Sequence, residues 1–296
     1  MRSNQGYSYR HILQQDAVGH TALTYLATKF SHSNSQEWLS RFQNNELVLD
    51  DKPASGAEPL KPGQVLIWNR PPWLEEDTPQ TFSFVHQDEH LLVVDKPSGL
   101  PTLPGAGFHL NTLLEMVRNS CPAAKPLHRL GRATSGLVLF ALDSKAASEL
   151  QRNWSQIQKQ YLALSSGIAS CDAYDIQTSI GPRDHPRLGK VYAADPLGKQ
   201  SRSVARVLER RKATTLFEVD LHTGRPHQIR IHLASIGHPL EGDPLYANGG
   251  QPKLDHPALP GDAGYWLHAK RLQFTHPITS KQIEINSIPP EILQAN

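Results

Sequence analysis

The sequence predicts an α+β fold in which a mixed, mainly antiparallel sheet follows a small N-terminal module. From residue 81 onward, short apolar or alternating segments recur, and few helical segments interrupt them. Strands and helices do not alternate regularly, which argues against a doubly wound parallel sheet. The length of 296 residues accommodates two domains, and we set their boundaries at 1–75 and 76–296.

The N-terminal module contains two helical patterns and two short extended runs. Apolar residues recur every three or four positions in both helical segments, and Asn34 or Ser35 can cap the second helix. The segment 71–79 reads as a linker. This pattern resembles the S4-type RNA-binding domain, in which the second helix and the following loop face RNA; a helical lid or a dimerisation arm is the alternative. The predicted elements are helices over 22–30 and 35–42 and strands over 46–49 and 64–68.

The second domain holds most of the predicted strands. The segment 137–142 is a continuous apolar run typical of a buried strand. Residues 95–99 have turn chemistry, and residues 242–264 form a loop rich in Gly and Pro. We predict strands over 82–84, 91–94, 137–142, 161–164, 204–208, 216–221, 272–274 and 283–285, and helices over 147–157 and 227–237.

The charge of the chain is small overall but unevenly distributed. The formal net charge is +2, whereas residues 199–232 hold eight Lys or Arg against three acids. Such a local excess is a candidate contact surface for RNA phosphates, and a solvated charged face is the alternative. Fifteen histidines form no metal-binding motif, so we expect them to be structural or RNA-facing rather than metal ligands.

The compartment follows from what the sequence lacks. Cys121 and Cys171 are isolated, which suits a reducing environment and argues against a disulfide scaffold or a zinc site. No apolar run approaches the roughly 18 residues of a membrane span, and the first residues lack the apolar core of a signal peptide. We therefore expect a cytoplasmic protein without a membrane partner.

Three segments concentrate residues that can act on a ligand. The first, 126–136, is a polar loop directly before the buried strand, and its glycines at 131 and 136 permit unusual backbone conformations. The second ends in Tyr161 at the start of another strand, where the ring belongs to the core or stacks on a base. The third, 222–233, sets arginines and histidines around a glycine turn.

The third segment predicts an anion-binding helix start. Pro226 suits the first position of a helix, and Gly237 supplies the stop. Arg230 lies off the apolar face, beside a helix N-terminus that favours anions. A solvated basic helix start is the alternative. The apolar face consists of Ile229, Leu233 and Ile236.

Four ordered blocks carry a family resemblance. They are Asp95-Lys-Pro-Ser-Gly99, His128-Arg-Leu-Gly-Arg-Ala-Thr-Ser-Gly136, Lys159-Gln-Tyr-Leu-Ala163, and Thr223-Gly-Arg-Pro-His-Gln-Ile-Arg230 with Gly237-His-Pro-Leu-Glu-Gly-Asp-Pro-Leu-Tyr246. Over roughly residues 81–290 the chain resembles the RluA-type RNA pseudouridine synthases, which modify uridines of ribosomal and transfer RNA. The resemblance implies a pseudouridine-synthase-type catalytic domain.

The resemblance implies that uridine is isomerised: the C–N glycosidic bond breaks, the uracil rotates, and the base rejoins through carbon. It implies no metal or redox cofactor, and a target uridine flipped into a pocket. By position, Arg129 fills the space of the flipped base, and Tyr161 stacks on or hydrogen-bonds the uracil. Arg230 pairs with the nucleophilic aspartate of the family, and Ile229 packs beneath it. The expected RNA contacts in the same blocks are His128, Arg132, Arg225 and His227.

The family has its nucleophilic aspartate where this chain has Gly131. A glycine offers no carboxylate to attack carbon or to orient a proton transfer, and the pattern resembles a variant branch of plants and photosynthetic bacteria. Arg230 then lacks its family partner, which is costly for a buried charge, so we hypothesise that a nearby carboxylate or an RNA phosphate neutralises it. The acids within the motif segments, each also a candidate relocated nucleophile, are the turn residues Asp95 and Asp243 and the helix N-cap Asp143.

The sequence leaves two functions open. The first is an active uridine isomerase with an altered or relocated carboxylate. The second is a catalytically inactive RNA-binding protein that retains the uridine pocket. A nucleotide-binding module of another kind lacks support, because neither a dinucleotide fingerprint nor a Walker-type loop is present. In both functions the partner is ribosomal or transfer RNA, and we expect a monomer.

Overall fold

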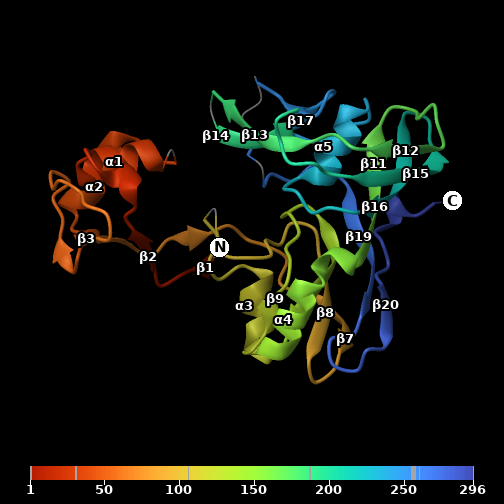
Figure 1. Cartoon of the computed structure of the whole chain (residues 1–296), viewed down its shortest axis with the longest axis horizontal. Coiled ribbons are helices and arrows are strands. Elements are labelled where there is room, and N and C mark those ends of the chain that lie inside the picture. The colour runs from red at the N-terminus through yellow and green to blue at the C-terminus, as the bar shows by residue number, and fades with distance from the viewer. Residues whose placement is uncertain are drawn as a thin grey trace. The chain divides into compact units, whose positions relative to one another are not determined.

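The computed structural model describes residues 2–30, 32–105, 107–186, 188–254, 258–259 and 261–295. The chain divides into two compact units, Met1–Glu76 and Asp77–Asn296 (Figure 1), and each is described by itself. Within the described ranges, no helix is long and apolar enough to cross a membrane.

In the N-terminal unit, two helices pack on a four-stranded antiparallel sheet of order β2-β5-β3-β4. Both predicted helices and both predicted strands are confirmed. The second helix begins with a capping box, in which Asn34 accepts from the backbone N–H of Glu37 and Glu37 accepts from that of Asn34. Trp38 and Phe42 of that helix are buried against the sheet. The elements are η1 (Gln15–Ala17), α1 (Ala22–Lys29), α2 (Ser35–Gln43), β2 (Tyr7–Ile12), β3 (Leu47–Leu49), β4 (Lys52–Pro53) and β5 (Val65–Arg70).

The predicted linker over 71–79 is partly wrong. Its centre forms β6 (Leu74–Glu75), which pairs with β1 (Arg2–Ser3). The side-chain amide of Asn4 donates to Glu75 Oε1 at 2.8 Å, and both side chains are buried. Because the partner strand lies at the other end of the unit in sequence, local composition could not reveal this pairing.

The second unit is built on a ten-stranded sheet with the main order β12-β15-β16-β11-β19-β10-β8-β7. The pairing of β10 with β19 is parallel, and the other strand pairs of this sheet are antiparallel. The predicted mixed, mainly antiparallel sheet is therefore confirmed. The strands are β7 (Ser83–Gln87), β8 (Leu91–Lys96), β9 (Lys125–Pro126), β10 (Ser135–Ala141), β11 (Gln158–Ser166), β12 (Ala173–Ile176), β15 (Ser203–Arg210), β16 (Thr214–Leu221), β19 (Leu267–Thr275) and β20 (Gln282–Asn286).

Continuous apolar runs in β8 and β10 are explained by burial on both faces of the sheet. Alternate residues of the two strands enter two different core clusters, one containing Phe140 and the other Leu139. The helix predicted over 147–157 is shorter, because α4 (Ser144–Arg152) ends and the 3-10 turn η2 (Trp154–Gln156) follows. Asp143 caps α4 as predicted, accepting from the N–H of Ala146 at 2.8 Å.

Several elements had no prediction. They include two strand pairs that form two-stranded sheets separate from the main one. In the second unit the elements without a prediction are α3 (Leu113–Ser120), β9, β12, the hairpin of β13 (Ile180–His185) and β14 (Gly189–Ala194), the pair β17 (Tyr246–Ala247) and β18 (Gln251–Pro252), and the 3-10 turn η3 (Glu291–Leu293).

The parallel pairing of β10 and β19 positions the candidate site. Gly136 lies opposite Ala269 with φ of +105°, and a Cβ atom on Gly136 would come within 2.3 Å of the Ala269 carbonyl oxygen. Only glycine permits this close approach. Since the two strands run in the same direction, the segments that enter them, 128–134 and 261–266, lie beside each other.

Candidate functional site

The helix predicted over 227–237 is α5 (Gln228–Ser235). His227 is its N-cap, with a left-handed φ of +55°, and Pro226 lies before the cap. The prediction that Pro226 takes the first helical position is therefore wrong. Gly237 follows the helix with φ of +86°, as expected for a stop.

Helix α5 is buried on all sides rather than along one apolar face. Residues 228–234 are all buried, including Arg230 at 2% exposure. Ile229 and Leu233 enter the core on the sheet, whereas Ile231 packs beside the β13–β14 hairpin. This burial excludes a solvated basic helix start.

Arg230 forms a buried, two-pronged ion pair with Asp243. Its Nε and Nη2 donate to the two carboxylate oxygens at 2.7 and 2.8 Å. Burial alone would lower the pKa of Arg230, but the hydrogen bonds with Asp243 raise it above its usual value. Burial likewise opposes ionisation of Asp243, but Arg230 holds the pKa of that carboxyl below its usual value. The hypothesis that a nearby carboxylate neutralises Arg230 is confirmed.

Asp243 also organises the turn in which it lies, as the sequence predicted. One of its oxygens accepts the backbone N–H groups of Leu245 and Tyr246 at 2.8 and 3.0 Å. Asp95, by contrast, lies within β8 rather than in a turn, and it accepts from the hydroxyl of Ser287. The turn prediction for Asp95 is therefore wrong.

Two tyrosine rings cover the Arg230 guanidinium. The ring centres of Tyr265 and Tyr246 lie 4.3 and 4.9 Å from its Cζ. The Tyr246 hydroxyl donates to the carbonyl of Tyr192 at 2.7 Å and lies 2.7 Å from His227 Nδ1. The Tyr265 hydroxyl lies 3.3 Å from the Thr134 hydroxyl. Tyr265 therefore links the Arg230 site to the loop before β10.

The loop before β10 is held by the segment that follows β8. The Lys96 ammonium is fully buried and donates to the Arg132 carbonyl at 3.2 Å as well as to two carbonyls of its own segment. The Ser98 hydroxyl donates to the Ala133 carbonyl at 2.6 Å. The first sequence block thus positions the second, a role that sequence reasoning did not assign to Lys96.

The predicted residues of that loop have different environments. Arg129 and Gly131 are exposed. The Arg132 guanidinium lies 4.6 Å from the Phe108 ring centre and donates to the Gly99 carbonyl at 3.2 Å. His128 Nε2 accepts the N–H of Leu139 at 3.0 Å, so this ring ties the loop to the middle of β10.

The remaining predicted residues come from β11 and the approach to α5. Tyr161 is 7% exposed and lies opposite Ala269 on the neighbouring strand; burial raises the pKa of its hydroxyl to about 12. The Arg225 guanidinium donates to the Gln200 carbonyl. One core cluster joins residues from separate blocks: Leu130, Tyr161, Ile229 and Tyr265. The structure therefore brings the second, third and fourth blocks together.

The basic stretch over 199–232 is not a free positive surface. Several of its arginines form ion pairs with carboxylates, some from this stretch and others from the β12 region. The local excess of charge predicted from the sequence is thus largely neutralised. The pairs are Arg202 with Asp175, Arg206 with Asp220, Arg210 with Asp172 and Arg211 with Glu209.

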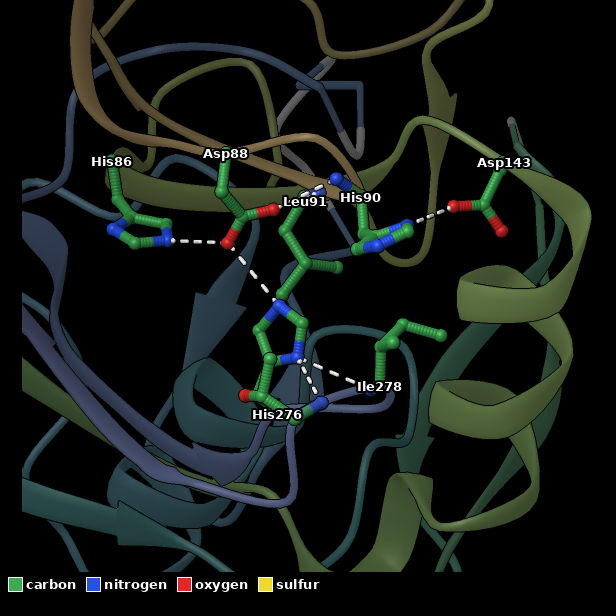
Figure 2. Close-up of polar contacts among 8 residues, drawn as sticks. His86, Asp88, His90, Leu91, Asp143, His276 and Ile278 are labelled. Carbon is green, nitrogen blue, oxygen red and sulfur yellow. Dashed lines mark hydrogen bonds and ion pairs between the residues drawn. The ribbon is translucent and has the colours of Figure 1, made fainter.

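A group of histidines beside α4 serves hydrogen bonding within the fold. Figure 2 shows Asp88 between His86 and His276, with Oδ2 at 3.1 and 3.2 Å from their Nε2 atoms. His90 Nδ1 lies 2.7 Å from Asp143 Oδ2, next to the start of the helix. Across the described residues, no group of three or more His, Cys, Asp or Glu is arranged to hold a metal ion.

Three buried or half-buried histidines predict acid sensitivity. Burial lowers the pKa of His128 and of His232 to about 4, and that of His227 to about 3. Between pH 6.5 and 4 the unfolded chain therefore binds protons that the folded chain does not. Stability should fall as the pH falls through this window, by up to about 1.4 kcal/mol per pH unit for each histidine. Urea unfolding at several pH values measures the slope.

One variant distinguishes the contribution of His128 from other effects of low pH on stability. His128→Gln keeps a hydrogen-bond acceptor for Leu139. The free energy of unfolding should then depend less steeply on pH, by the contribution of about one proton. A slope equal to that of the wild type would contradict the assignment.

Comparisons with known proteins agree with the four blocks. A family model described as RNA pseudouridylate synthase matches residues 90–235. The chain is 40% identical to an uncharacterised RNA pseudouridine synthase of Synechocystis, over 92% of this chain and 95% of that protein. It is 34% identical to RNA pseudouridine synthase 5 of Oryza sativa, over 98% of this chain and 89% of that protein. The solved structure of human RNA Pseudouridylate Synthase Domain Containing 1 superposes with a TM-score of 0.56 at 25% identity, over 75% of this chain and 89% of that one. The chain belongs to the RluA-type RNA pseudouridine synthases, which are isomerases that act on RNA.

Proposed function

We propose that the protein converts uridine to pseudouridine in ribosomal or transfer RNA at the site around Arg230. The observation that carries this proposal is that Leu130, Tyr161 and Ile229, from separate sequence blocks, share one core cluster with Tyr265, whose ring lies on the buried Arg230–Asp243 pair. In this site Arg129 fills the space of the flipped base, and Tyr161 contacts the uracil. His128 supports the loop, and Arg132, Arg225 and His227 lie at its RNA-facing rim.

Gly131 stands at the position of the family's nucleophilic aspartate, so the reaction proceeds without a carboxylate there. This feature also favours the second function, a catalytically inactive protein that binds RNA through the same pocket. The two functions share Arg129, Tyr161 and Arg230, so a binding experiment cannot separate them. A direct test for pseudouridine is required.

The test compares pseudouridine in RNA from a wild-type and a deletion strain by carbodiimide mapping of ribosomal and transfer RNA. At least one pseudouridine should disappear on deletion and return when purified protein acts on the deletion-strain RNA. Arg129→Ala changes an exposed side chain and should leave the fold intact while removing most of the activity. Loss of no pseudouridine on deletion would favour the inactive RNA-binding protein.

For the N-terminal unit, we propose an S4-like role in RNA binding. Stacked aromatic rings and guanidinium groups lie together in this unit: Tyr9 stacks on Trp68 at 5.4 Å between ring centres, and Arg41 of α2 lies 4.4 Å from the Trp68 ring centre. Arg70 lies 3.6 Å from the ring centre of Trp73. Aromatic and arginine planes are the groups on which single-stranded RNA bases stack.

Tyr9→Ala should weaken binding of RNA by about 5- to 150-fold, the loss expected for one base-stacking contact. Tyr9 is 40% exposed, so its removal should leave thermal unfolding almost unchanged. Ile12→Ala is the matched control, because Ile12 is 46% exposed on the opposite face of the same strand. Filter binding with deletion-strain RNA measures both variants, and equal affinities would refute this surface.

The remaining parts of the proposal concern assembly and compartment. The protein acts as a monomer in the cytoplasm. Both cysteines are free thiols, as suits a reducing compartment. Light scattering of the purified protein and fractionation of cells that produce it test these two statements.

A further inference from the structure

We propose that the Tyr265 hydroxyl occupies the place of the side chain that Gly131 lacks, and that it contacts the target nucleotide there. The inference rests on the proposed function, since that function places the nucleotide between Arg129, Tyr161 and Arg230. It assigns a substrate-binding role to a residue outside the four sequence blocks.

The space beside Gly131 is already taken. A Cβ atom on this residue would lie 3.0 Å from the Tyr265 hydroxyl oxygen and 3.5 Å from the Thr134 hydroxyl oxygen. The backbone of Gly131 is not in the left-handed region, so the conformation itself does not require glycine. The neighbouring hydroxyl therefore explains why a residue without a side chain fits here.

The fold brings Tyr265 to this place by two close backbone approaches. Gly136 lets β10 and β19 run side by side, which sets the segment before β19 next to the 128–134 loop. Gly242, with φ of +73°, comes so close to Gly264 that a Cβ atom would lie 2.1 Å from the Gly264 carbonyl oxygen. These two glycines precede Asp243 and Tyr265, so both side chains reach Arg230.

The Tyr265 hydroxyl has capacity for another partner. The ring is 5% exposed and contacts the guanidinium of Arg230, with its centre 4.3 Å from Cζ. Its hydroxyl makes one described hydrogen bond, with Thr134. The Tyr246 hydroxyl, on the same guanidinium, already has two partners within the protein. A phenol can donate one hydrogen bond and accept others, so Tyr265 can still bind a ligand oxygen.

The charges of the site suit a phenol better than a carboxylate. Arg230 and Asp243 already neutralise each other in a buried pair. A carboxylate at position 131 would add a second negative charge near a guanidinium that Asp243 already pairs, which costs free energy through like-charge repulsion. A neutral hydroxyl provides a donor and an acceptor for the ribose or the uracil of the flipped nucleotide without this cost.

The test is Tyr265→Phe, which removes the hydroxyl and keeps the ring on Arg230. The substrate is total RNA from the deletion strain, which contains the natural target in unmodified form. We expect the single-turnover rate of pseudouridine formation to fall by about 10- to 100-fold, as for loss of a hydrogen bond to a reacting group. The melting temperature should fall only slightly, through loss of the hydrogen bond with Thr134. Tyr192→Phe alters an exposed tyrosine and should retain the full rate. Equal rates for Tyr265→Phe and the wild type would overturn the proposal.

A measurement of RNA affinity tests the role of Tyr265 even if the isomerase proposal fails. If the wild type forms no pseudouridine, the isomerase proposal fails, and the affinity for the same RNA decides on Tyr265. Tyr265→Phe should then bind at least about five times more weakly than Tyr192→Phe, and equal affinities would overturn the inference.

Combined variants test whether the Tyr265 hydroxyl occupies the space of a side chain at position 131. Gly131→Ala should lower the melting temperature more in the wild type than in the Tyr265→Phe background, because the atom nearest the new methyl group is then absent. Gly131→Asp should reduce activity rather than restore it. Equal effects of Gly131→Ala in the two backgrounds, or a gain of activity in Gly131→Asp, would contradict the inference.

Discussion

Asp243→Asn should lower the free energy of unfolding by about 3–5 kcal/mol, the cost of removing one partner from a buried ion pair. The variant removes the carboxylate that forms the two-pronged pair with the Arg230 guanidinium, which is only 2% exposed. Urea unfolding at neutral pH measures the loss. Asp175→Asn, which breaks the exposed pair with Arg202, is the matched control and should have little effect.

A double variant shows what the pair contributes beyond stability. Replacing both members by apolar residues, as in Arg230→Met with Asp243→Leu, should recover part of the lost stability, because no charge is left unpaired. Activity should stay absent, since the cation beneath Tyr265 is gone. A single Asp243→Asn variant as stable as the wild type would show that another group neutralises Arg230.

Gly136→Ala should destabilise the second unit by about 2–5 kcal/mol, or prevent its folding. The left-handed backbone costs a non-glycine residue about 1–2 kcal/mol, and the collision with Ala269 at 2.3 Å adds an overpacking cost of about 1–3 kcal/mol. Since Gly136 lies where β10 meets β19, the damage falls on the centre of the sheet. Circular dichroism during thermal unfolding measures the effect.

Gly249→Ala separates the conformational cost from the overpacking cost. Gly249 also has a left-handed φ, of +85°, but a Cβ atom there meets nothing within 4 Å. This variant should show the conformational cost alone, about 1–2 kcal/mol. Similar melting temperatures for both variants would rule out the close approach as the main cause.

The sequence predicted those parts of the fold that depend on local patterns. Apolar runs such as 137–142 identified strands, and Asp143 identified a helix start, because the signals for both lie within a few neighbouring residues. The hairpin of β13 and β14 and the pairing of β1 with β6 had no such signal. The partner of β1 lies about 70 residues away, and the hairpin packs against α5, which is also distant in sequence.

For the same reason, the sequence predicted residues of the candidate site but not the contacts between them. The blocks named Arg129, Tyr161 and Arg230, but they could not show that Asp243 holds Arg230 or that Tyr265 reaches Gly131. Both contacts depend on glycines that let the backbones of separate strands and loops come close together. The missing carboxylate at position 131 indicated only that something else would face Arg230. The backbone partner of the half-buried His128 likewise became known only from the structure.

The ion pairs of the 199–232 stretch affect how RNA can be held. A cation that already has a carboxylate partner exchanges one partner for another when a phosphate arrives, and it releases few counterions. The logarithm of RNA affinity should therefore decline only shallowly with the logarithm of salt concentration, with a slope well below that expected from eight free cations. Selection among RNAs would then depend on the shape of the folded RNA and on exposed bases, and it would persist at salt concentrations that abolish purely electrostatic binding.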